Sequence, residues 1–483
     1  MELIGLVRRK AYVDSVALMR VSDQLRALPG VLSASAVMAT DLNRELLADA
    51  GLLTDDAKTA AANDLVVSVR AETREAARAA LERAEALLAS RRAEEGPVQD
   101  APPRSLLSAG RRSAGATVAL ISVPGPYAAA EAHQALSAGL HVFLFSDNVP
   151  VSEEIALKRR GAARGLLVMG PECGTSIING VGLGFANRVR RGDIGLVGAS
   201  GTGLQEVTTL IHRLGAGISH AIGTGGRDLD AAVGGLTTLQ ALEWLGRDVA
   251  TRAIVIVSKP PSDAVAQRVL AAAVATGKPV VACLLGWKGA TPAAVRAVAT
   301  LEDAARGAVE AVGRTPLALV APPPDLAPRA RGTIRGLYTG GSLCEEAESI
   351  ISADGHRFTD FGSGEYTRGR PHPMIDPGLR NAAVAAAGGD ASVGVVLVDV
   401  VLGYGAHANP AGALASAVAS ARAGATRSGR TLHVVGHVVG TDDDPQRLPE
   451  QEAMLREAGV LVCPSNRLAA ELARALVGAP DGS

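Results

Sequence analysis

The first ninety residues alternate between short apolar runs and amphipathic segments. This pattern predicts three strands and three helices, in the order strand 2–7, helix 13–28, strand 31–39, helix 42–50, strand 64–70 and helix 74–88. Strand and helix alternating in this way are typical of a small α+β sandwich of the split βαβ type. We therefore predict an α+β domain over residues 1–90, in which we find no cluster of catalytic residue types.

A different rhythm begins at residue 114, where continuous apolar runs alternate with helical segments. Such a rhythm is typical of a parallel sheet covered by helices. It restarts near Ile194 and near Ile334, and the polar, proline-bearing stretches 91–113 and 313–332 are predicted linkers. The predicted strands are 118–123, 142–146, 166–169, 194–197, 221–223, 253–257, 280–285, 334–338, 393–398, 431–435 and 460–462.

The fold class that follows is α/β. We expect three Rossmann-like or flavodoxin-like parallel-sheet domains, preceded by the small α+β domain. Their predicted boundaries are 114–190, 191–312 and 333–483.

The core that this pattern implies is aliphatic. Hydrophobic residues make up 47% of the 483, but aromatic residues only 2%, so Ala, Val, Leu and Ile must fill it. Few aromatic rings also argue against binding single-stranded nucleic acid, which needs stacking platforms. Lys and Arg total 48 against 49 for Asp and Glu, a formal net charge of −1. We therefore expect no nucleic-acid partner and no anionic membrane surface.

The four cysteines lie far apart and form no CxxC pair, so neither a zinc site nor a disulfide framework is expected. We predict that all four are buried, reduced thiols. The first ten residues place their charges after an apolar run, the wrong order for a signal peptide. No stretch reaches the ~20 apolar residues that span a bilayer. We expect a soluble, cytoplasmic protein without a metal.

Two glycine-rich loops carry the strongest local signal. In the first, a strand ending near Val197 runs into Gly198-Ala199-Ser200-Gly201-Thr202-Gly203, and a helix follows. Glycines allow a close backbone approach, and free N–H groups at a helix start favour an anion. The loop lacks the lysine of a P-loop and the spacing of a dinucleotide fingerprint. The alternative is a tight turn that binds nothing.

The second loop has the same arrangement of strand, small residues and helix. It consists of Thr339, Gly340, Gly341 and Ser342. Alone it is a weak signal. Two such helix starts in neighbouring domains are consistent with one phosphate held between their positive ends, across a domain interface or in an oligomer. The predicted phosphate-binding residues are Ser200, Gly201, Thr202, Thr339, Gly340, Gly341 and Ser342.

These strings resemble known proteins. Residues 114–290 resemble the α subunit of succinyl-CoA synthetase and related acyl-CoA synthetases, through GPECG at 170–174, GLVGASGT at 195–202 and GTGGRD at 223–228. Residues 333–480 resemble the carboxy-terminal ligase domain of that family's β subunit. The fused order, the α+β block and the strings SDNV at 146–149 and GRPHPMIDP at 369–377 resemble the FdrA family, over nearly the whole chain.

The departures from the synthetases are informative. The resemblance implies a phosphate-carrying histidine in the loop after Leu285, but residues 286–292 read GWKGATP. Lys259 stands where the relatives' orienting glutamate would be. No segment corresponds to the ATP-grasp domain, so we expect no ATP site and no phosphohistidine relay. Lys259 would instead add positive charge near a bound phosphate.

Further candidates follow other predicted strands. Residues 367–380 are dense in polar groups: Arg368, Arg370 and Arg380 could clamp a carboxylate or phosphate, and His372 could transfer a proton. The alternative is a rigid loop whose arginines pair with Asp360, Glu365 and Asp376. Arg227, Asp399 and Asn409 are candidate substrate-binding residues. Whether Cys173 or His407 is catalytic is left open.

The FdrA resemblance implies an enzyme component that handles an acyl or carbamoyl phosphate. Its most specific form is a subunit of an oxamate carbamoyltransferase in allantoin breakdown, with His372, Arg370 and Lys259 as catalytic residues. We expect a small anionic substrate, partner subunits encoded nearby and an oligomer. No cofactor is certain, and CoA binding in 114–190 is left open. Two rivals are an acyl-CoA synthetase and a non-enzymatic regulatory or scaffold protein.

Overall fold

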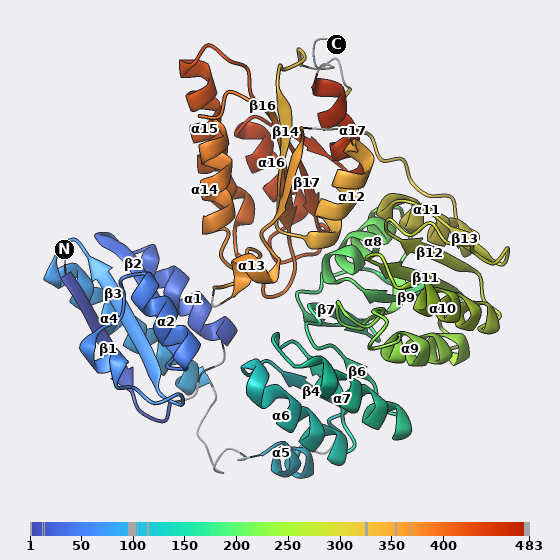
Figure 1. Ribbon diagram of the computed structural model, residues 1–483, viewed down its shortest axis with the longest axis horizontal. Helices are drawn as coiled ribbons and strands as arrows, with labels where there is room; N and C mark the ends of the chain where they lie inside the picture. The colour runs from blue at the N-terminus through green and yellow to red at the C-terminus, as the bar shows by residue number, and fades with distance from the viewer. Residues whose placement is uncertain are drawn as a thin grey trace. The chain divides into compact units, whose positions relative to one another are not determined.

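The computed structural model describes residues 2–477 except 12, 14, 95–102, 104, 114, 324–326, 353–354 and 369. The chain divides into two units. The first comprises Met1–Ala109 and Thr367–Pro371, and the second comprises Gly110–Tyr366 and His372–Ser483. Each unit is described by itself, with the labels of Figure 1.

The first unit holds an antiparallel sheet in the order β1-β3-β2. Its elements are β1 (Glu2–Arg8), α1 (Ser15–Arg26), β2 (Val31–Met38), α2 (Asp41–Asp49), α3 (Asp55–Lys58), β3 (Leu65–Ala71) and α4 (Arg74–Glu94). Leu25 of α1 and Ala80 of α4 pack with Val67 and Val69 on one core, whereas Leu47 of α2 packs with Val66 on a smaller one. Helices therefore cover both faces, and the predicted α+β fold is confirmed.

The second unit opens with a small parallel sheet in the order β4-β5-β6. Its strands are β4 (Val118–Ile121), β5 (His141–Leu144) and β6 (Val168–Met169), which follow helix α5 (Leu106–Arg112) at the boundary of the units. Helices α6 (Gly125–Ser137) and α7 (Val151–Ala163) connect the strands. This is the βαβ rhythm that the apolar runs predict.

The next sheet has seven strands in the order β13-β12-β11-β9-β10-β7-β8. Five of them are parallel: β9 (Arg191–Ala199), β10 (Ile218–Gly223), β11 (Ala253–Ser258), β12 (Val280–Leu284) and β13 (Val295–Ala297). Its helices are α8 (Gly201–Arg213), α9 (Leu236–Arg247), α10 (Asp263–Ala275) and α11 (Leu301–Ala311). Helices α8 and α11 pack together, and so do α9 and α10.

Strands β7 (Thr175–Ile178) and β8 (Val181–Gly184) were not predicted. They form an antiparallel hairpin that extends the seven-stranded sheet next to β10. Asn179 and Gly180 join them, both with positive φ, at 53° and 82°. An Asn-Gly pair is the residue choice of a two-residue hairpin turn, so the sequence did carry the signal.

The last sheet is parallel, in the order β15-β14-β16-β17-β18. Its strands are β14 (Thr333–Tyr338), β15 (Arg357–Asp360), β16 (Val393–Val401), β17 (His433–Val439) and β18 (Val460–Cys463). Its helices are α12 (Gly341–Ile351), α13 (Gly364–Thr367), α14 (Gly378–Ala387), α15 (Pro410–Arg427), α16 (Leu448–Glu457) and α17 (Asn466–Leu476). Helices α14 and α15 pack together, as do α12 and α17, on opposite sides of the sheet (Figure 1).

Both large sheets share one topology. Read from the first strand of each domain, β9 and β14, the order is 2-1-3-4-5, which is flavodoxin-like. In this order the second strand lies on one side of the first strand, and the third, fourth and fifth strands lie on the other side. Ligands of such folds bind at the carboxyl ends of the strands at this switch point. Helices α8 and α12 begin at this point of their sheets. The predicted α/β fold class is confirmed.

Within the described residues no helix combines the length and the apolar character that crossing a membrane requires.

Candidate functional site

The two glycine-rich helix starts meet. Ser200 precedes α8, and its Oγ accepts a hydrogen bond from the N–H of Gly203 at 2.9 Å, which caps the helix. Ser342 lies in the first turn of α12. The Oγ atoms of Ser200 and Ser342 are 2.5 Å apart, and both side chains are buried. The N-termini of two helices from two domains therefore face one point.

Both residues that open α12 are glycines with close neighbours, and the approach is most restrictive at Gly340. A Cβ on Gly340 would lie 2.9 Å from the Cβ of Thr202. A Cβ on Gly341 would lie 2.5 Å from Oδ2 of Asp360 and 3.0 Å from Nζ of Lys259. The first N–H groups of a helix have no acceptor within it, and the helix dipole makes this end positive. Two such ends, with serine hydroxyls between them, can bind a small anion.

Asp399 holds the loop that leads into α12. Its carboxylate accepts hydrogen bonds from the N–H of Thr339 at 2.6 Å and of Gly340 at 2.7 Å. The side chain is fully buried, and burial raises the pKa of Asp399 above its ordinary value, although Arg380 and these two N–H groups oppose the shift. Arg380 is equally buried and donates to the carbonyl oxygen of Asp399 at 2.7 Å. Both predicted substrate contacts are thus already occupied by protein groups, and their binding roles stay predictions.

Charged groups surround the two helix starts. Lys259 follows β11, and its Nζ lies 2.8 Å from Oε1 of Glu345 in α12, with 39% of the lysine side chain exposed. Asp360 ends β15, and its Oδ1 accepts from the N–H of Gly362 at 2.8 Å. Burial raises the pKa of Asp360 to about 6, against the N–H of Gly362 and Lys259, which lower it. Glu345 lies one turn beyond the predicted loop at the start of α12, and the sequence indicates Asp360 only as a partner for the arginines, because its short strand β15 carries no motif.

His372 lies beside Asp360. A Cβ on Gly362 would be 2.8 Å from Nε2 of His372 and 3.1 Å from Oδ1 of Asp360. The imidazole packs on Phe185, with 5.8 Å between ring centroids, and its Nδ1 accepts from the N–H of Met374 at 3.2 Å. Burial lowers the pKa of His372 to about 4. Near neutral pH the ring is therefore uncharged, and because Nδ1 accepts from Met374, its proton lies on Nε2, which can donate a hydrogen bond.

The remaining predicted contacts lie on several separate segments of the chain. Arg368 and Arg370 are exposed residues of the segment that belongs to the first unit. The guanidinium of Arg227 lies 3.0 Å from Oε2 of Glu154 and donates to the carbonyl of Val149 at 2.9 Å. Asn409 caps α15 by accepting from Gly412 at 3.0 Å. Binding roles for these four residues stay predictions.

The cysteines are free and all four are buried, which confirms the expected burial of reduced thiols. Burial raises the pKa of Cys173 to about 11, so the unreactive thiol dominates at neutral pH. In the loop after β16, Nδ1 of His407 accepts from the N–H of Asn409 at 3.1 Å. A catalytic role for His407 stays open.

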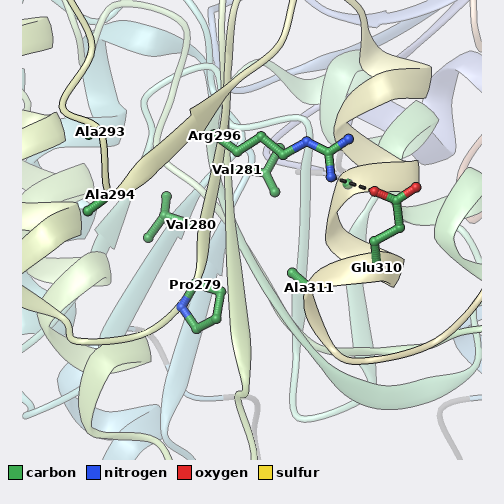
Figure 2. Close-up of a pocket in the computed structure, with 9 residues that line it drawn as sticks. Pro279, Val280, Val281, Ala293, Ala294, Arg296, Glu310 and Ala311 are labelled. Atoms are coloured by element: carbon green, nitrogen blue, oxygen red, sulfur yellow. Dashed lines mark hydrogen bonds and ion pairs between the residues drawn. The ribbon is translucent and has the colours of Figure 1, made fainter.

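One surface pocket of about 370 Å³ lies away from the helix starts, between β12, β13 and α11 (Figure 2). Its charged side chains, Arg296 and Glu310, pair with each other at 2.5 Å. Because that pair leaves the pocket without a free charge, we assign it no ligand.

Comparisons with protein families identify three regions of the chain. Residues 337–476 match the CoA-ligase family, and residues 189–286 match the CoA binding domain. Residues 1–103 match a family described as AllF, heavy metal-associated domain. The CoA-ligase match contains the start of α12, and the CoA binding domain match contains the start of α8. The expectation of a CoA site in 114–190 is separate from these matches and stays a prediction.

Similar proteins extend the picture. Uncharacterized protein YahF of Escherichia coli (strain K12) is 38% identical over 98% of this chain and 98% of its own. The succinate–CoA ligase [ADP-forming] α subunit of Aquifex aeolicus (strain VF5) is 32% identical over 31% of this chain, which spans about half of that subunit (49%). A dinucleotide-forming acetyl-coenzyme A synthetase 1 of Ca. Korarchaeum cryptofilum, solved with phosphate and ADP, covers 79% of this chain and 84% of its own at 14% identity. The TM-score of this structural match is 0.35.

A heavy metal does not fit the first unit. Residues 1–103 contain neither cysteine nor histidine, whose thiolate and imidazole groups are the usual ligands of such metals. Among the described residues of the whole chain, no group of three or more His, Cys, Asp or Glu side chains is placed to hold a metal ion. The likeness of this domain to metal-associated domains is therefore a likeness of fold.

Proposed function

Because the chain belongs to the FdrA-like family that includes YahF, with a CoA-binding and a CoA-ligase domain, we propose that it handles an acyl or carbamoyl phosphate. The specific proposal is a subunit of an oxamate carbamoyltransferase in allantoin breakdown. The match of residues 1–103 to a domain named for AllF supports that link. The observation that carries the proposal is the 2.5 Å contact between Ser200 and Ser342, at two helix starts that face each other.

The reaction is the phosphorolysis of oxalurate. A phosphate oxygen attacks the carbamoyl carbon, the bond from that carbon to the oxamate nitrogen breaks, and a proton is delivered to that nitrogen. The products are carbamoyl phosphate and oxamate. The phosphate lies between the starts of α8 and α12, where N–H groups and serine hydroxyls bind its oxygens. Lys259, beside Gly341, offsets part of its charge.

Neither ATP nor a phosphohistidine is needed in this scheme, because phosphate itself is the attacking group. The loop after β12 contains no histidine, and the chain has no segment resembling ATP-grasp. His372 stays a candidate for the carboxylate end of the substrate, whereas Arg380 already donates to the carbonyl oxygen of Asp399. The neutral imidazole of His372, with its proton on Nε2, can donate a hydrogen bond there.

The test is to purify the chain with the products of its neighbouring genes and to supply oxamate plus carbamoyl phosphate. Oxalurate is expected, measured by chromatography, and the rate should fall when Ser342→Ala replaces the native chain. Ser349→Ala is the matched control, since its hydroxyl bonds only within α12. Absence of oxalurate with every combination of partners would refute the proposal.

An acyl-CoA synthetase is the second candidate, which the CoA-ligase match favours. It predicts that CoA binds the isolated chain and that acyl-phosphate turnover depends on CoA. Isothermal titration with CoA distinguishes it from the carbamoyltransferase. A purely regulatory protein would instead keep its cellular function when Ser200 and Ser342 are both replaced by alanine.

A further inference from the structure

The sheet of the first unit has two edges of different character. At one edge, the pairing of β2 with β3 shifts register between Val31 and Ser33, which marks a bulge or irregularity. At the other edge, β1 pairs with β3 in unbroken register over its whole length, Glu2–Arg8. In the parts of the chain that the structure describes, β3 is the only strand that pairs with β1.

Proteins protect a free strand edge with bulges, prolines or charges in its middle, because unpaired N–H and C=O groups recruit other strands. Strand β2 has its irregularity, but β1 has none of these devices. Its five central residues, Leu3–Val7, are uncharged and contain no proline, and Leu3 is 37% exposed. Within the described residues of the first unit, the edge of β1 is therefore long and regular, and no further strand pairs with it.

The sequence of β1, ELIGLVR, identifies that second strand. When two copies run antiparallel with Gly5 opposite Gly5, Glu2 of each copy lies opposite Arg8 of the other. Leu3 then faces Val7, and Ile4 faces Leu6. Every cross-strand pair is apolar or oppositely charged, which is the condition for favourable pairing. Within Glu2–Arg8, no other antiparallel register places Glu2 opposite Arg8 and Gly5 opposite Gly5.

We propose that β1 pairs antiparallel with β1 of a second copy of this chain, about a twofold axis at Gly5. The two three-stranded sheets then join into one sheet of six strands. The contact is isologous, so one patch serves both copies and the assembly closes as a dimer. This interface is independent of the proposed carbamoyl chemistry.

The groups that the pairing needs are accessible in the single chain. Glu2 is exposed, and the side chain of Arg8 is 31% exposed. Arg8 also lies 3.1 Å from Oε1 of Glu85, an exposed contact that contributes little by itself. Gly5 is a glycine for an internal reason, since a Cβ there would lie 2.9 Å from Thr54. The twofold axis therefore passes a position with no side chain to clash.

Charge reversal provides the test, with the full-length chain and sedimentation velocity. Glu2→Arg places two arginines opposite each other at both ends of the paired strands, and Arg8→Glu places two glutamates there. Each variant alone should dimerise at least about tenfold more weakly than the native chain. A mixture of the two variants restores both opposite-charge pairs, so it should form heterodimers with near-native affinity. The double variant E2R/R8E should also dimerise.

Matched controls separate pairing from folding and from other contacts. Glu85→Ala removes the internal partner of Arg8 but leaves the charges of β1 unchanged, so it should dimerise like the native chain. Thermal melting followed by circular dichroism verifies that every variant is folded. A native chain that is monomeric at its highest soluble concentration would overturn the proposal. Equal self-association of the native chain and both single variants would overturn it as well.

Discussion

The hydroxyl of Ser342 is the residue on which the anion site can be tested most cleanly. Its Oγ contacts Ser200 but does not cap a helix, whereas Ser200 also caps α8. Ser342→Ala should weaken the binding of inorganic phosphate by about tenfold or more, because a hydrogen bond to a charged group contributes about 1.5–3 kcal/mol. Isothermal titration measures the change.

Ser200→Ala should show the same loss together with lower stability, by about 1 kcal/mol for the missing cap. Ser349→Ala, on the same helix, should change neither property. A folded S342A chain that binds phosphate as well as the native chain would rule out the site between the helix starts.

Asp360 should make anion binding depend on pH. Burial raises the pKa of Asp360 to about 6, and its carboxylate lies against the start of α12. Below this pKa the side chain is neutral, and above it the negative charge repels an anion. The affinity for sulfate should therefore fall as the pH rises through about 6.

Asp360→Asn should bind sulfate more tightly at neutral pH and should lose this step. Sulfate is the better probe because its own charge is constant over the range, unlike that of phosphate. A pH step that persists in the D360N chain would assign the titration to another group.

At the scale of single residues, the sequence could predict a site residue only where that residue stands in a local motif. Ser200 and Ser342 stand in glycine-rich turns, and the structure brings these predicted residues together. Asp360 reaches the same place only because β15 pairs with β14, which no local pattern encodes. Arg380 has the residue type of an anion clamp, but its position in the core became visible only in the fold.

At the scale of elements, Gly340 sets how closely the start of α12 can approach the start of α8. Gly340→Ala would place a methyl group 2.9 Å from the Cβ of Thr202 and 3.0 Å from Cδ1 of Leu343, so the two helix starts must separate. We expect a loss of about 1–3 kcal/mol in the free energy of unfolding, as for other overpacked sites. Phosphate binding should weaken in parallel.

Gly364→Ala is the matched control for this substitution, since nothing lies within 4 Å of its Cβ position. Urea unfolding gives the free energies for the native chain and both variants. Equal stability of the G340A and G364A chains would show that the helices can separate without cost.

Most elements could be predicted because their apolar runs are long. Strand β16 is buried along its whole length, and strand β11 likewise, so both read as continuous hydrophobic stretches. The missed strands are short and lie at or near a sheet edge. Strand β15 has four residues, of which Arg357 is exposed, and β7 and β8 form a hairpin of four residues each. Runs this short, with polar residues among the apolar ones, lack the pattern on which such a prediction depends.

At the scale of the whole second unit, two domains are joined through buried polar groups. Glu206 of α8 accepts from the N–H of Asn466, and its Oε2 lies 2.7 Å from Nε2 of His437. The carboxylate of Glu346 in α12 accepts from the N–H of Leu301 at 2.6 Å and from Nδ2 of Asn466 at 2.7 Å. Helices α8 and α11 thus meet α12 and α17 across the boundary that the sequence places at a linker.

This junction predicts how stability varies with pH. Burial raises the pKa of Glu346 from an ordinary 4.5 to about 7, so the folded chain keeps a proton that the unfolded chain has released. The stability that this proton contributes is complete below about 4.5 and is lost as the pH rises through about 7. The pKa of His437 is also raised, against burial, by the carboxylate of Glu206, and its contribution is lost in the same direction.

Glu346→Gln cannot ionise, so its melting temperature should fall less steeply between about pH 6 and pH 8.5 than that of the native chain. The slope of melting temperature against pH is the deciding measurement. The melting temperature at a single pH is not, because the amide of the variant also changes one hydrogen bond at every pH. A smaller fall of the melting temperature with pH should remain in E346Q, because the pKa of His437 is also raised. Glu348→Gln, an exposed position on the same helix, should keep the native slope. Parallel curves for the native and E346Q chains would mean that Glu346 carries its charge in the folded protein, and that the two domains are joined by an ionised network.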